Sequence, residues 1–395
     1  MADQTEVGCV PSRNPAGPLE TRRMAGLDGL RGVAALLVVG GHLTGQIVAV
    51  TGVYLFFILS SFLLMSQFLR WRPADFLNLR RWGHYALRRS ARVLPLFMLV
   101  ACVSALTTAL APGWMKGIGF PITVEPSELA GVMTMREGPA VLWSIPVEFK
   151  FYLVLAAAAA LVIVVLRGWL WGGAMLLGGL AVAAGAWFEP AHHGLSVWPF
   201  LALFLTGCLA AVLHRLLETA LAEAGPATSA RRWALEGTGW LMLLGWALTM
   251  PLGQKLLLGV GLDRNLFIVS HGLFAVLFGT LVLTVLHGRG VLRWLLDRAW
   301  MRWVGAVSFS LYLWHTGPIQ AFDAWGVHPK LGGILAIVVS LVLSGVTYRW
   351  FERPILEATK HWLRPAEARQ RPAATAGDEP AVIADAPPRV ERPAA

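Results

Sequence analysis

Long apolar stretches recur along this chain between Gly32 and Phe351, and they constrain its fold more than any other feature. Stretches of about 18 or more such residues can cross a hydrocarbon core of about 30 Å as helices. Only 14% of the residues are charged, against about 25% in an ordinary soluble domain, which excludes a soluble enzyme. We therefore predict an all-α, polytopic transmembrane helical bundle of about ten spans. The predicted spans are 32–50, 52–69, 91–110, 140–166, 169–187, 197–213, 236–254, 266–286, 303–322 and 331–351.

Basic residues gather in the segments that this pattern places on one side of the membrane. The chain carries 33 Lys and Arg against 23 Asp and Glu, a formal net charge of +10. The stretch from Arg70 to Arg92 alone holds seven arginines and a single acid, Asp75. Positive residues in short loops favour the cytoplasmic side, so we predict cytoplasmic termini and a multi-pass protein of the cell (inner) membrane. Orientation accounts for the excess charge, and no nucleic-acid partner is predicted.

The two ends of the chain are polar. Residues 1–25 lack the apolar core of a cleavable signal peptide, and residues 364–395 form a stretch rich in Pro and Ala. Neither segment could bury much apolar surface. We predict disordered tails over these two segments and a transmembrane domain over 26–363.

Metal-ligating residues show no informative spacing. Cys9, Cys102 and Cys208 are far apart in the sequence and form no CxxC pair. His192 and His193 are adjacent, a pattern more typical of a solvated loop than of a metal cluster. No metal site is predicted.

A few ionisable side chains within the spans mark a candidate site, because such residues cost several kcal/mol each in a membrane and usually face a polar interior. They are His42, Glu148, Lys150, His271 and His315, with Arg31, Arg92, Arg349 and Glu352 near the inner ends. At about 1.5 Å of rise per residue, His42, His315, Glu148 and Ser60 fall in one layer near the midplane. Four polar side chains from four helices are thus predicted to lie at one depth.

This combination suits general acid–base chemistry. An imidazole held by a carboxylate can take a proton from a hydroxyl group. Each residue alone also has a structural explanation, because a buried histidine can bond a backbone carbonyl and Glu148 can pair with Lys150. The shared depth favours the functional interpretation.

Three arginines just below the membrane form a second candidate site. Arg88 and Arg92 are four residues apart and are predicted to share one helix face, with Arg89 beside them. These arginines could serve only to set the orientation of the bundle in the membrane. The functional alternative is a phosphate site, because forked guanidinium groups bind phosphates bidentately, and an acyl-CoA would fit such a site.

Six sequence motifs in fixed order resemble the integral-membrane acyltransferase family 3. They are Leu27-Asp28-Gly-Leu-Arg31 followed by His42, Gly52 to Phe62, Arg88-Arg-Ser-Ala-Arg92-Val-Leu-Pro95, Leu142 to Tyr152, Ser308 to His315, and Arg349-Trp-Phe-Glu352-Arg-Pro354. Together they cover the chain from about Leu27 to Pro354. The resemblance implies a ten-helix bundle that moves an acyl group, commonly acetyl from cytoplasmic acetyl-CoA, onto a hydroxyl of a carbohydrate or related acceptor.

The resemblance also implies roles for individual residues. His42 matches the essential histidine of the family and Arg31 its paired arginine, while Glu148 matches the acidic residue of its motif. Arg89 and Arg92 match the arginine pair of the donor site, to which we add Arg88. Further candidates for the catalytic or acceptor site are His315, Ser60, Tyr312 and Asp28.

Four positions depart from the family pattern. Tyr54 stands where an acidic or other polar residue is frequent, and Ser61 where glycine is usual. Pro146 and Lys150 replace small polar residues and Gln. These changes leave the acyl-transfer residues in place but affect what can be inferred about the acceptor.

The sequence therefore favours a membrane O-acyltransferase. Its predicted partners are the bilayer, acyl-CoA (acetyl-CoA) as co-substrate and a carbohydrate acceptor such as a surface polysaccharide or glycolipid. No permanently bound cofactor is predicted, and the oligomeric state is left open. One alternative is acylation of a small, macrolide-like metabolite; another is a proton-coupled secondary transporter, which predicts broken spans and internal repeats.

Overall fold

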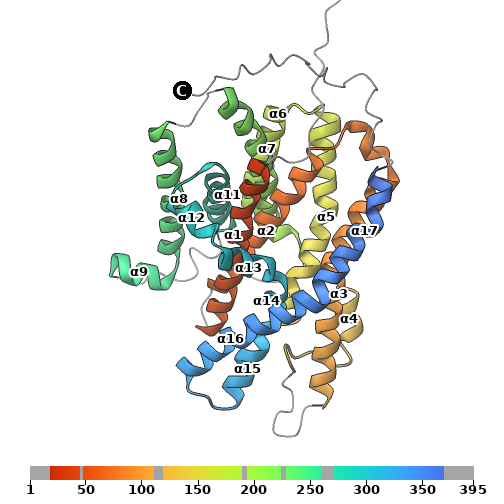
Figure 1. The fold of residues 1–395 in the computed structure, drawn as a ribbon, viewed down its shortest axis with the longest axis vertical. Coiled ribbons are helices and arrows are strands. Elements are labelled where there is room, and N and C mark those ends of the chain that lie inside the picture. Colours follow the sequence, from red (N-terminus) through yellow and green to blue (C-terminus); the bar gives the residue numbers. More distant parts are fainter. Residues whose placement is uncertain are drawn as a thin grey trace, which may run out of the picture.

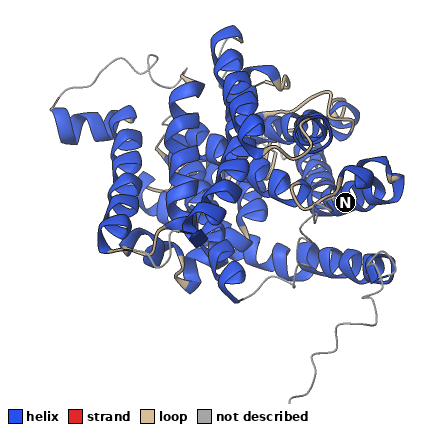
Figure 2. Cartoon of the chain, turned by 90° about the horizontal axis from the view of Figure 1, so that it is seen from above, coloured by secondary structure: helices blue, strands red, loops and turns tan. Residues whose placement is uncertain are grey.

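All the regular secondary structure in the described part of the protein is helical. The structure, a computed structural model, describes residues 18–44, 48–110, 119–188, 194–223, 228–259 and 270–368. No strand occurs in these ranges, and the helices form one bundle (Figures 1 and 2). The all-α prediction is confirmed.

The helices differ widely in length. The first half of the chain forms α1 (Pro18–Leu43), α2 (Val48–Phe68), η1 (Pro73–Leu77), α3 (Leu79–Leu110), α4 (Leu129–Met133), η3 (Ala140–Trp143), α5 (Ser144–Ala160), η4 (Leu161–Val165) and α6 (Leu170–Trp187). The second half forms η5 (Trp198–Phe200), α7 (Leu201–Glu223), α8 (Ser229–Thr249), α9 (Pro251–Leu258), α11 (His271–His287), α12 (Val291–Leu296), α13 (Ala299–Ala306), α14 (Ser308–Trp314), α15 (Thr316–Ala324), α16 (Pro329–Thr347), η6 (Tyr348–Glu352) and α17 (Arg353–Ala368).

Seven helices in the described ranges are long and apolar enough to cross a membrane. They are Ala25–Leu43, Val48–Phe68, Leu79–Leu110, Ala140–Val165, Leu170–Trp187, Trp198–Leu221 and Pro329–Leu363. Together with shorter apolar helices they form a polytopic bundle, so the chain is an integral membrane protein. The other three predicted spans correspond to α8, to α11 with its 17 residues, and to the broken series α13, α14 and α15.

The predicted span 303–322 is not one helix. It is interrupted at Val307 and again at His315. Pro318 explains the second break, since a proline in this register has no N–H to donate to the carbonyl of Trp314. The break places His315 between the two short helices α14 and α15.

Several helix ends differ from the predicted boundaries. The first span was predicted to reach residue 50, whereas α1 ends at Leu43 and α2 begins at Val48. Helix α1 begins at Pro18, inside the predicted tail 1–25. Helix α17 continues to Ala368, past residue 363. Its sequence is strongly amphipathic, and this pattern favours a helix.

Small residues let α1 approach its neighbours closely. Gly29 and Gly32 lie on the side of α1 that packs against α12 and α13. A methyl group on either would overlap the carbonyl oxygens of Leu296 or Met301. Close packing of this kind is the usual basis of helix association in membranes. It fixes the face of α1 that carries Arg31.

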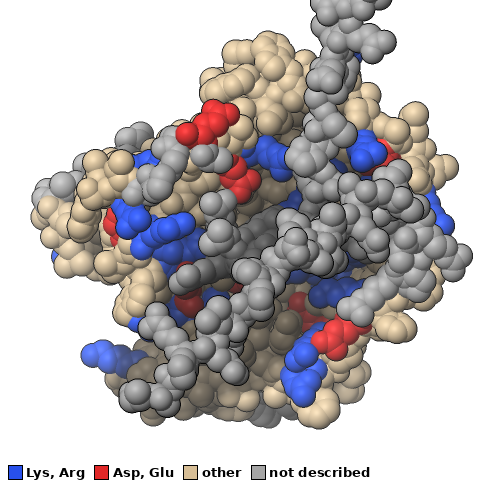
Figure 3. Space-filling view, turned by 45° about the horizontal axis from the view of Figure 1, so that its top comes forward, with Lys and Arg blue, Asp and Glu red and all other residues tan. Residues whose placement is uncertain are grey.

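Basic side chains are spread over one end of the bundle. Figure 3 brings the top of Figure 1 forward, and Lys and Arg side chains outnumber acidic ones in that view. The loop between α2 and α3 and the end of α5 lie at this end (Figure 1). It is the end that the arginine distribution predicts to be cytoplasmic, and we call it the inner end.

Candidate active site

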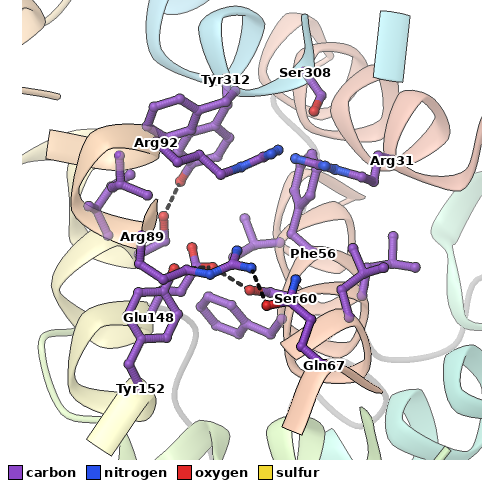
Figure 4. Close-up of a pocket in the computed structure, with 18 residues that line it drawn as sticks. Arg31, Phe56, Ser60, Gln67, Arg89, Arg92, Glu148, Tyr152, Ser308 and Tyr312 are labelled. Carbon is purple, nitrogen blue, oxygen red and sulfur yellow. Dashed lines mark hydrogen bonds between the residues drawn. The ribbon is translucent and has the colours of Figure 1, made fainter. Parts of the chain in front are cut away.

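A cavity of about 210 Å³ lies between α1, α2, α3, α5 and α14 (Figure 4). Its apolar wall includes Phe56, Leu59 and Leu63. Its polar lining comes from these five helices: Arg31, Ser60, Gln67, Arg89, Arg92, Ser144, Glu148, Tyr152, Ser308 and Tyr312. We call it the central cavity. It contains three arginines and one carboxylate, so its charge favours an anionic ligand.

Two of these arginines face each other. Figure 4 shows the guanidinium groups of Arg31 and Arg92 pointing toward one another. Neither forms an ion pair or hydrogen bond within the described residues, and they interact as like charges. Such a pair repels unless an anion lies between the two groups. The geometry therefore provides a place for a phosphate or another anion.

The third arginine, Arg89, extends this positive surface toward the inner end. Its Nη2 donates to Oε1 of Gln67 at 3.4 Å, and its buried Nε has no partner among the described residues. Arg88 was predicted to share a face with Arg92, but only Arg89 and Arg92 line the central cavity. Residues three apart and residues four apart are both neighbours on a helix surface. The spacing therefore could not show whether Arg88 or Arg89 lies beside Arg92 in the cavity.

Glu148 is held by two hydroxyl groups. Ser60 Oγ and Tyr152 Oη both donate to its Oε1, the second at 2.9 Å. Its Oε2 has no protein partner within the described residues. The carboxylate is thus oriented within the cavity as a counter-charge to the arginines.

A second carboxylate lies behind the arginine pair. Glu352 is 4% exposed and accepts a hydrogen bond from Ser310 Oγ at 2.9 Å. It interacts electrostatically with Arg92 and Arg31. Its place on the π-helical turn η6 is consistent with the frequent occurrence of such turns at functional sites.

Tyr312 lies in the wall of the central cavity and is fixed by its hydroxyl. Its Oη donates to the carbonyl oxygen of Val141 at 2.6 Å and lies 2.8 Å from Ser144 Oγ. Since the Tyr312 proton is used toward Val141, the Ser144 hydroxyl is the donor of the second bond. This pair joins α14 to the start of α5.

His42 and His315 form a pair beyond Tyr312. His42 is in the last turn of α1 and is exposed, whereas His315 is fully buried one helical turn after Tyr312. His315 Nε2 lies 3.2 Å from His42 Nδ1, and the rings of Tyr312 and His315 are 6.2 Å apart. The pair therefore lies at the outer end of α1, next to the wall of the central cavity.

The backbone carbonyls determine which ring nitrogens carry protons. His315 Nδ1 lies 2.8 Å from the carbonyl oxygen of Tyr312 and must donate to it, so Nε2 of the neutral ring accepts. His42 Nδ1 lies 2.9 Å from the Val38 carbonyl oxygen and 3.2 Å from His315 Nε2, so both of its neighbours are acceptors. It therefore carries the proton. The lone pair of neutral His42 is then on Nε2, the nitrogen that a general base would use.

The predicted single layer separates into two groups. The hydrogen bonds of His42 go to Val38 and His315, while those of Glu148 go to Ser60 and Tyr152. The sequence suggested that Glu148 holds the imidazole of His42. No hydrogen bond joins the two residues within the described part of the chain. Depth along a helix fixes only one coordinate, and lateral position depends on packing. Arg31, predicted as the partner of His42, lies with Arg92 in the cavity.

The remaining predicted residues lie outside the central cavity. Asp28 is exposed and interacts with Arg31, Arg92 and Arg302 near the inner end. Lys150 is also exposed, and its Nζ donates to the Leu195 carbonyl oxygen at 2.5 Å. His192 and His193 fall outside the described residues.

His271 is buried next to the unusual Tyr54. Its Nε2 lies 3.0 Å from Tyr54 Oη, and its Nδ1 lies 2.5 Å from the Pro199 carbonyl oxygen. Tyr54 is fully buried, with Phe200 and Phe274 beside its ring. Both residues therefore hold α2 against η5 and α11, outside the cavity lining.

Sequence reasoning missed Gln67 as a site residue. It lies two helical turns after Ser60 on α2, and both line the central cavity. A polar residue seven positions from another on an otherwise apolar helix was the available signal, because residues i and i+7 share a face.

The family model for an acyltransferase domain, acyltransferase family 3, matches residues 24–349. The chain belongs to acyltransferase family 3. This match covers the central cavity and the histidine pair, so the protein is a membrane acyltransferase. The broken crossing at His315 is a feature that the transporter alternative also predicts, but family membership identifies an enzyme.

One relative of this acyltransferase is the peptidoglycan O-acetyltransferase OatA of Listeria monocytogenes serovar 1/2a (strain EGD-e). The two are 23% identical over 370 residues, which cover 83% of this chain and 55% of that protein. The chain thus spans about half the length of this relative. No solved structure matches the chain.

Proposed function

We propose that this protein transfers an acyl group, acetyl in the simplest case, from acyl-CoA to a hydroxyl of a carbohydrate acceptor. The observation that carries the proposal is the facing pair Arg31 and Arg92, whose guanidinium groups form no ion pair or hydrogen bond within the described residues. The phosphates of CoA are suitable anions. With Arg89, these residues would hold the donor at the inner end.

The thioester would extend from the arginines toward the histidine pair. The cavity passes from Gln67 and Arg89 near the inner end to Tyr312, and His315 is one turn beyond. Apolar residues such as Phe56 line this path and suit the uncharged arm of the donor. In this arrangement the donor enters from the inner end, and its thioester approaches His42 at the outer end of α1.

His42 would act as the general base. Its Nε2 would take the proton of the acceptor hydroxyl while the hydroxyl oxygen attacks the thioester carbonyl carbon. The carbon–sulfur bond then breaks, and the CoA thiolate leaves and accepts that proton from the imidazolium. The same lone pair would be the nucleophile in a two-step route through an acyl-histidine.

The proposed acceptor is a hydroxyl of a cell-envelope carbohydrate. The exposure of His42 at the outer end of α1 supports an acceptor that approaches from the outside. The relative's name, peptidoglycan O-acetyltransferase, supports a carbohydrate polymer. A small, macrolide-like metabolite is the competing acceptor.

Deletion of the gene, combined with mass spectrometry, tests this proposal. Envelope glycans of the deletion strain should lose the mass of one acetyl group per modified sugar, and the wild-type gene should restore it. A His42→Ala gene should insert normally and fail to restore it. Glycans that are unchanged while a secreted metabolite loses the acyl group would overturn the carbohydrate acceptor.

A further inference from the structure

A second hollow of about 340 Å³ adjoins the central cavity at the inner end of α2 and α3. Gln67 lines both cavities, and the consecutive residues Arg88 and Arg89 line one each. The hydrogen bond from Arg89 to Gln67 therefore lies at their boundary. We call this second hollow the side cavity. Its position makes it the natural extension of a ligand that enters the central cavity from the inside.

One wall of the side cavity is aromatic. Phe68, Trp71 and Tyr85 line it, and the ring of Phe68 lies 4.8 Å from that of Trp71 and 4.9 Å from that of Tyr85. Trp82 lies 5.2 Å from Trp71 and packs behind this wall. Aromatic surfaces of this kind bind nucleobases by stacking, with little dependence on base identity.

The aromatic wall is held by the short helix η1. Trp82 Nε1 donates to the Phe76 carbonyl oxygen at 2.9 Å, and Arg81 Nη1 lies 2.9 Å from Asp75 Oδ2. Asp75 also accepts from the backbone N–H of Arg72 at 2.8 Å. The loop between α2 and α3 is thus a braced structure, and its surface is preorganised for a ligand.

Cationic groups line the rest of the side cavity. Arg70, Arg81 and Arg88 contribute three guanidinium groups from the loop and from α3. Arg81 forms an ion pair with Asp75. Guanidinium groups next to aromatic rings are typical of sites for phosphorylated nucleosides.

A buried hydroxyl group of the side cavity lacks a hydrogen-bond partner within the described residues. Tyr85 is 7% exposed, and its Oη has no hydrogen-bond partner among the described residues. A buried polar atom without a partner costs about 1–3 kcal/mol, so such atoms are rare unless a ligand or water satisfies them. Tyr85 lines the side cavity, where a polar ligand would satisfy it.

We infer that the side cavity binds the adenosine 3′,5′-bisphosphate end of the acyl-CoA donor. The inference rests on the proposed function, since it takes the donor to be a CoA thioester. The base would lie on the aromatic wall and the 3′-phosphate near Arg70 and Arg88. The diphosphate would pass Gln67 toward Arg89 and the facing pair Arg31 and Arg92, and the arm would continue into the central cavity. Arg88 thus has a different role from Arg89 and Arg92.

Calorimetric titration of the full-length protein with adenosine 3′,5′-bisphosphate tests the inference directly. Nanodiscs of phosphatidylcholine keep anionic lipid headgroups out of the measurement. Trp71→Ala and Arg88→Gln should each weaken binding at least about tenfold, and Trp71→Phe should keep most of it because a ring remains. Arg289→Gln, an exposed arginine outside both cavities, should leave binding unchanged. Absence of binding to the wild type, or equal binding by Trp71→Ala, would overturn the inference.

A comparison of two donors separates this inference from the proposed function. Acetylpantetheine has the thioester and part of the arm but no nucleotide. Trp71→Ala should raise KM for acetyl-CoA about tenfold without changing kcat, and should leave kcat/KM for acetylpantetheine unchanged. If the wild type transfers acetyl from acetyl-CoA but Trp71→Ala has an unchanged KM, the inference fails and the proposed function stands. If neither donor is used, the proposed function fails, and the titration still decides whether the side cavity binds the nucleotide.

Discussion

His315 lies with its Nε2 3.2 Å from Nδ1 of His42, and the buried ring thereby selects the tautomer of the exposed one. The selection works because His315 must donate its own Nδ1 proton to the Tyr312 carbonyl oxygen. His42 is left with its lone pair on Nε2, directed away from the pair. His315 is therefore a positioning residue.

Replacing His315 tests this relationship. In His315→Ala, His42 keeps only its bond to the Val38 carbonyl oxygen, and we expect kcat to fall by at least about tenfold, or about 1.4 kcal/mol of transition-state stabilisation. KM for acetyl-CoA should not change, because the arginines are untouched. A kinetic assay with acetyl-CoA and a glycan acceptor measures both. A His315→Ala variant with a normal kcat, or with a loss confined to KM for acetyl-CoA, would contradict the positioning role.

Removing one of the facing arginines should have two opposite effects. Arg92→Gln relieves the repulsion from Arg31, so the melting temperature of the protein without donor should stay equal or rise. Stabilisation by CoA should fall, since a ligand at 100 times its Kd contributes about 2.7 kcal/mol and binding would be weakened. Melting curves with and without CoA provide the measurement, and Arg289→Gln is the matched control. If CoA raises the melting temperature of Arg92→Gln as much as that of the wild type, Arg92 does not bind the donor and only sets the orientation of the bundle.

Glu148 offers a test of charge against hydrogen bonding. Glu148→Gln keeps an oxygen for the Ser60 and Tyr152 hydroxyls but makes the central cavity more positive, so KM for acetyl-CoA should fall or stay equal. Glu148→Ala leaves the buried Tyr152 hydroxyl without its partner and should cost about 1–3 kcal/mol of stability. In both variants kcat should stay close to the wild-type value, because no hydrogen bond joins Glu148 to His42 within the described residues. A large loss of kcat would show that Glu148 acts on His42 after all.

Ser61 on α2 packs closely against a glycine on α7, Gly207. Ser61 is fully buried, and a methyl group on Gly207 would overlap its Oγ and the Ile58 carbonyl oxygen. Gly207→Ala should therefore destabilise the protein by roughly 1–3 kcal/mol. Gly237→Ala on α8, where the space is open, is the control and should be neutral or slightly stabilising. Equal melting temperatures for the two variants would argue against tight packing of α2 on α7.

Much of the fold could be predicted from the sequence because the membrane imposes it. A span must be apolar over its length, so the approximate positions of most helices follow from composition. The break at His315 did not follow, although Pro318 was visible, because prolines also occur inside continuous membrane helices. The end of α1 at Leu43 was missed although Thr44, Gly45 and Gln46 follow it, because the apolar stretch resumes at Ile47.

The candidate site could be predicted only as a set of residues. Motif positions identified His42, Glu148 and Arg92, and helical rise placed polar residues at a common depth. Rise says nothing of the lateral direction, and so it could not show that His42 meets His315 while Glu148 meets Ser60. The contribution of Tyr85 to the side cavity had no signal in the sequence, because it depends on how η1 packs against α3.

Acetyl transfer by the purified protein in proteoliposomes is the most direct test of the central claim, that His42 is the base and acyl-CoA the donor. Acetyl-CoA labelled in its acetyl group would be supplied on the inner side with a glycan acceptor outside. The wild type should acetylate the acceptor, and His42→Ala should lower kcat by roughly 10²- to 10⁴-fold, while CoA binding persists. Full transfer by a normally inserted His42→Ala protein would contradict the account.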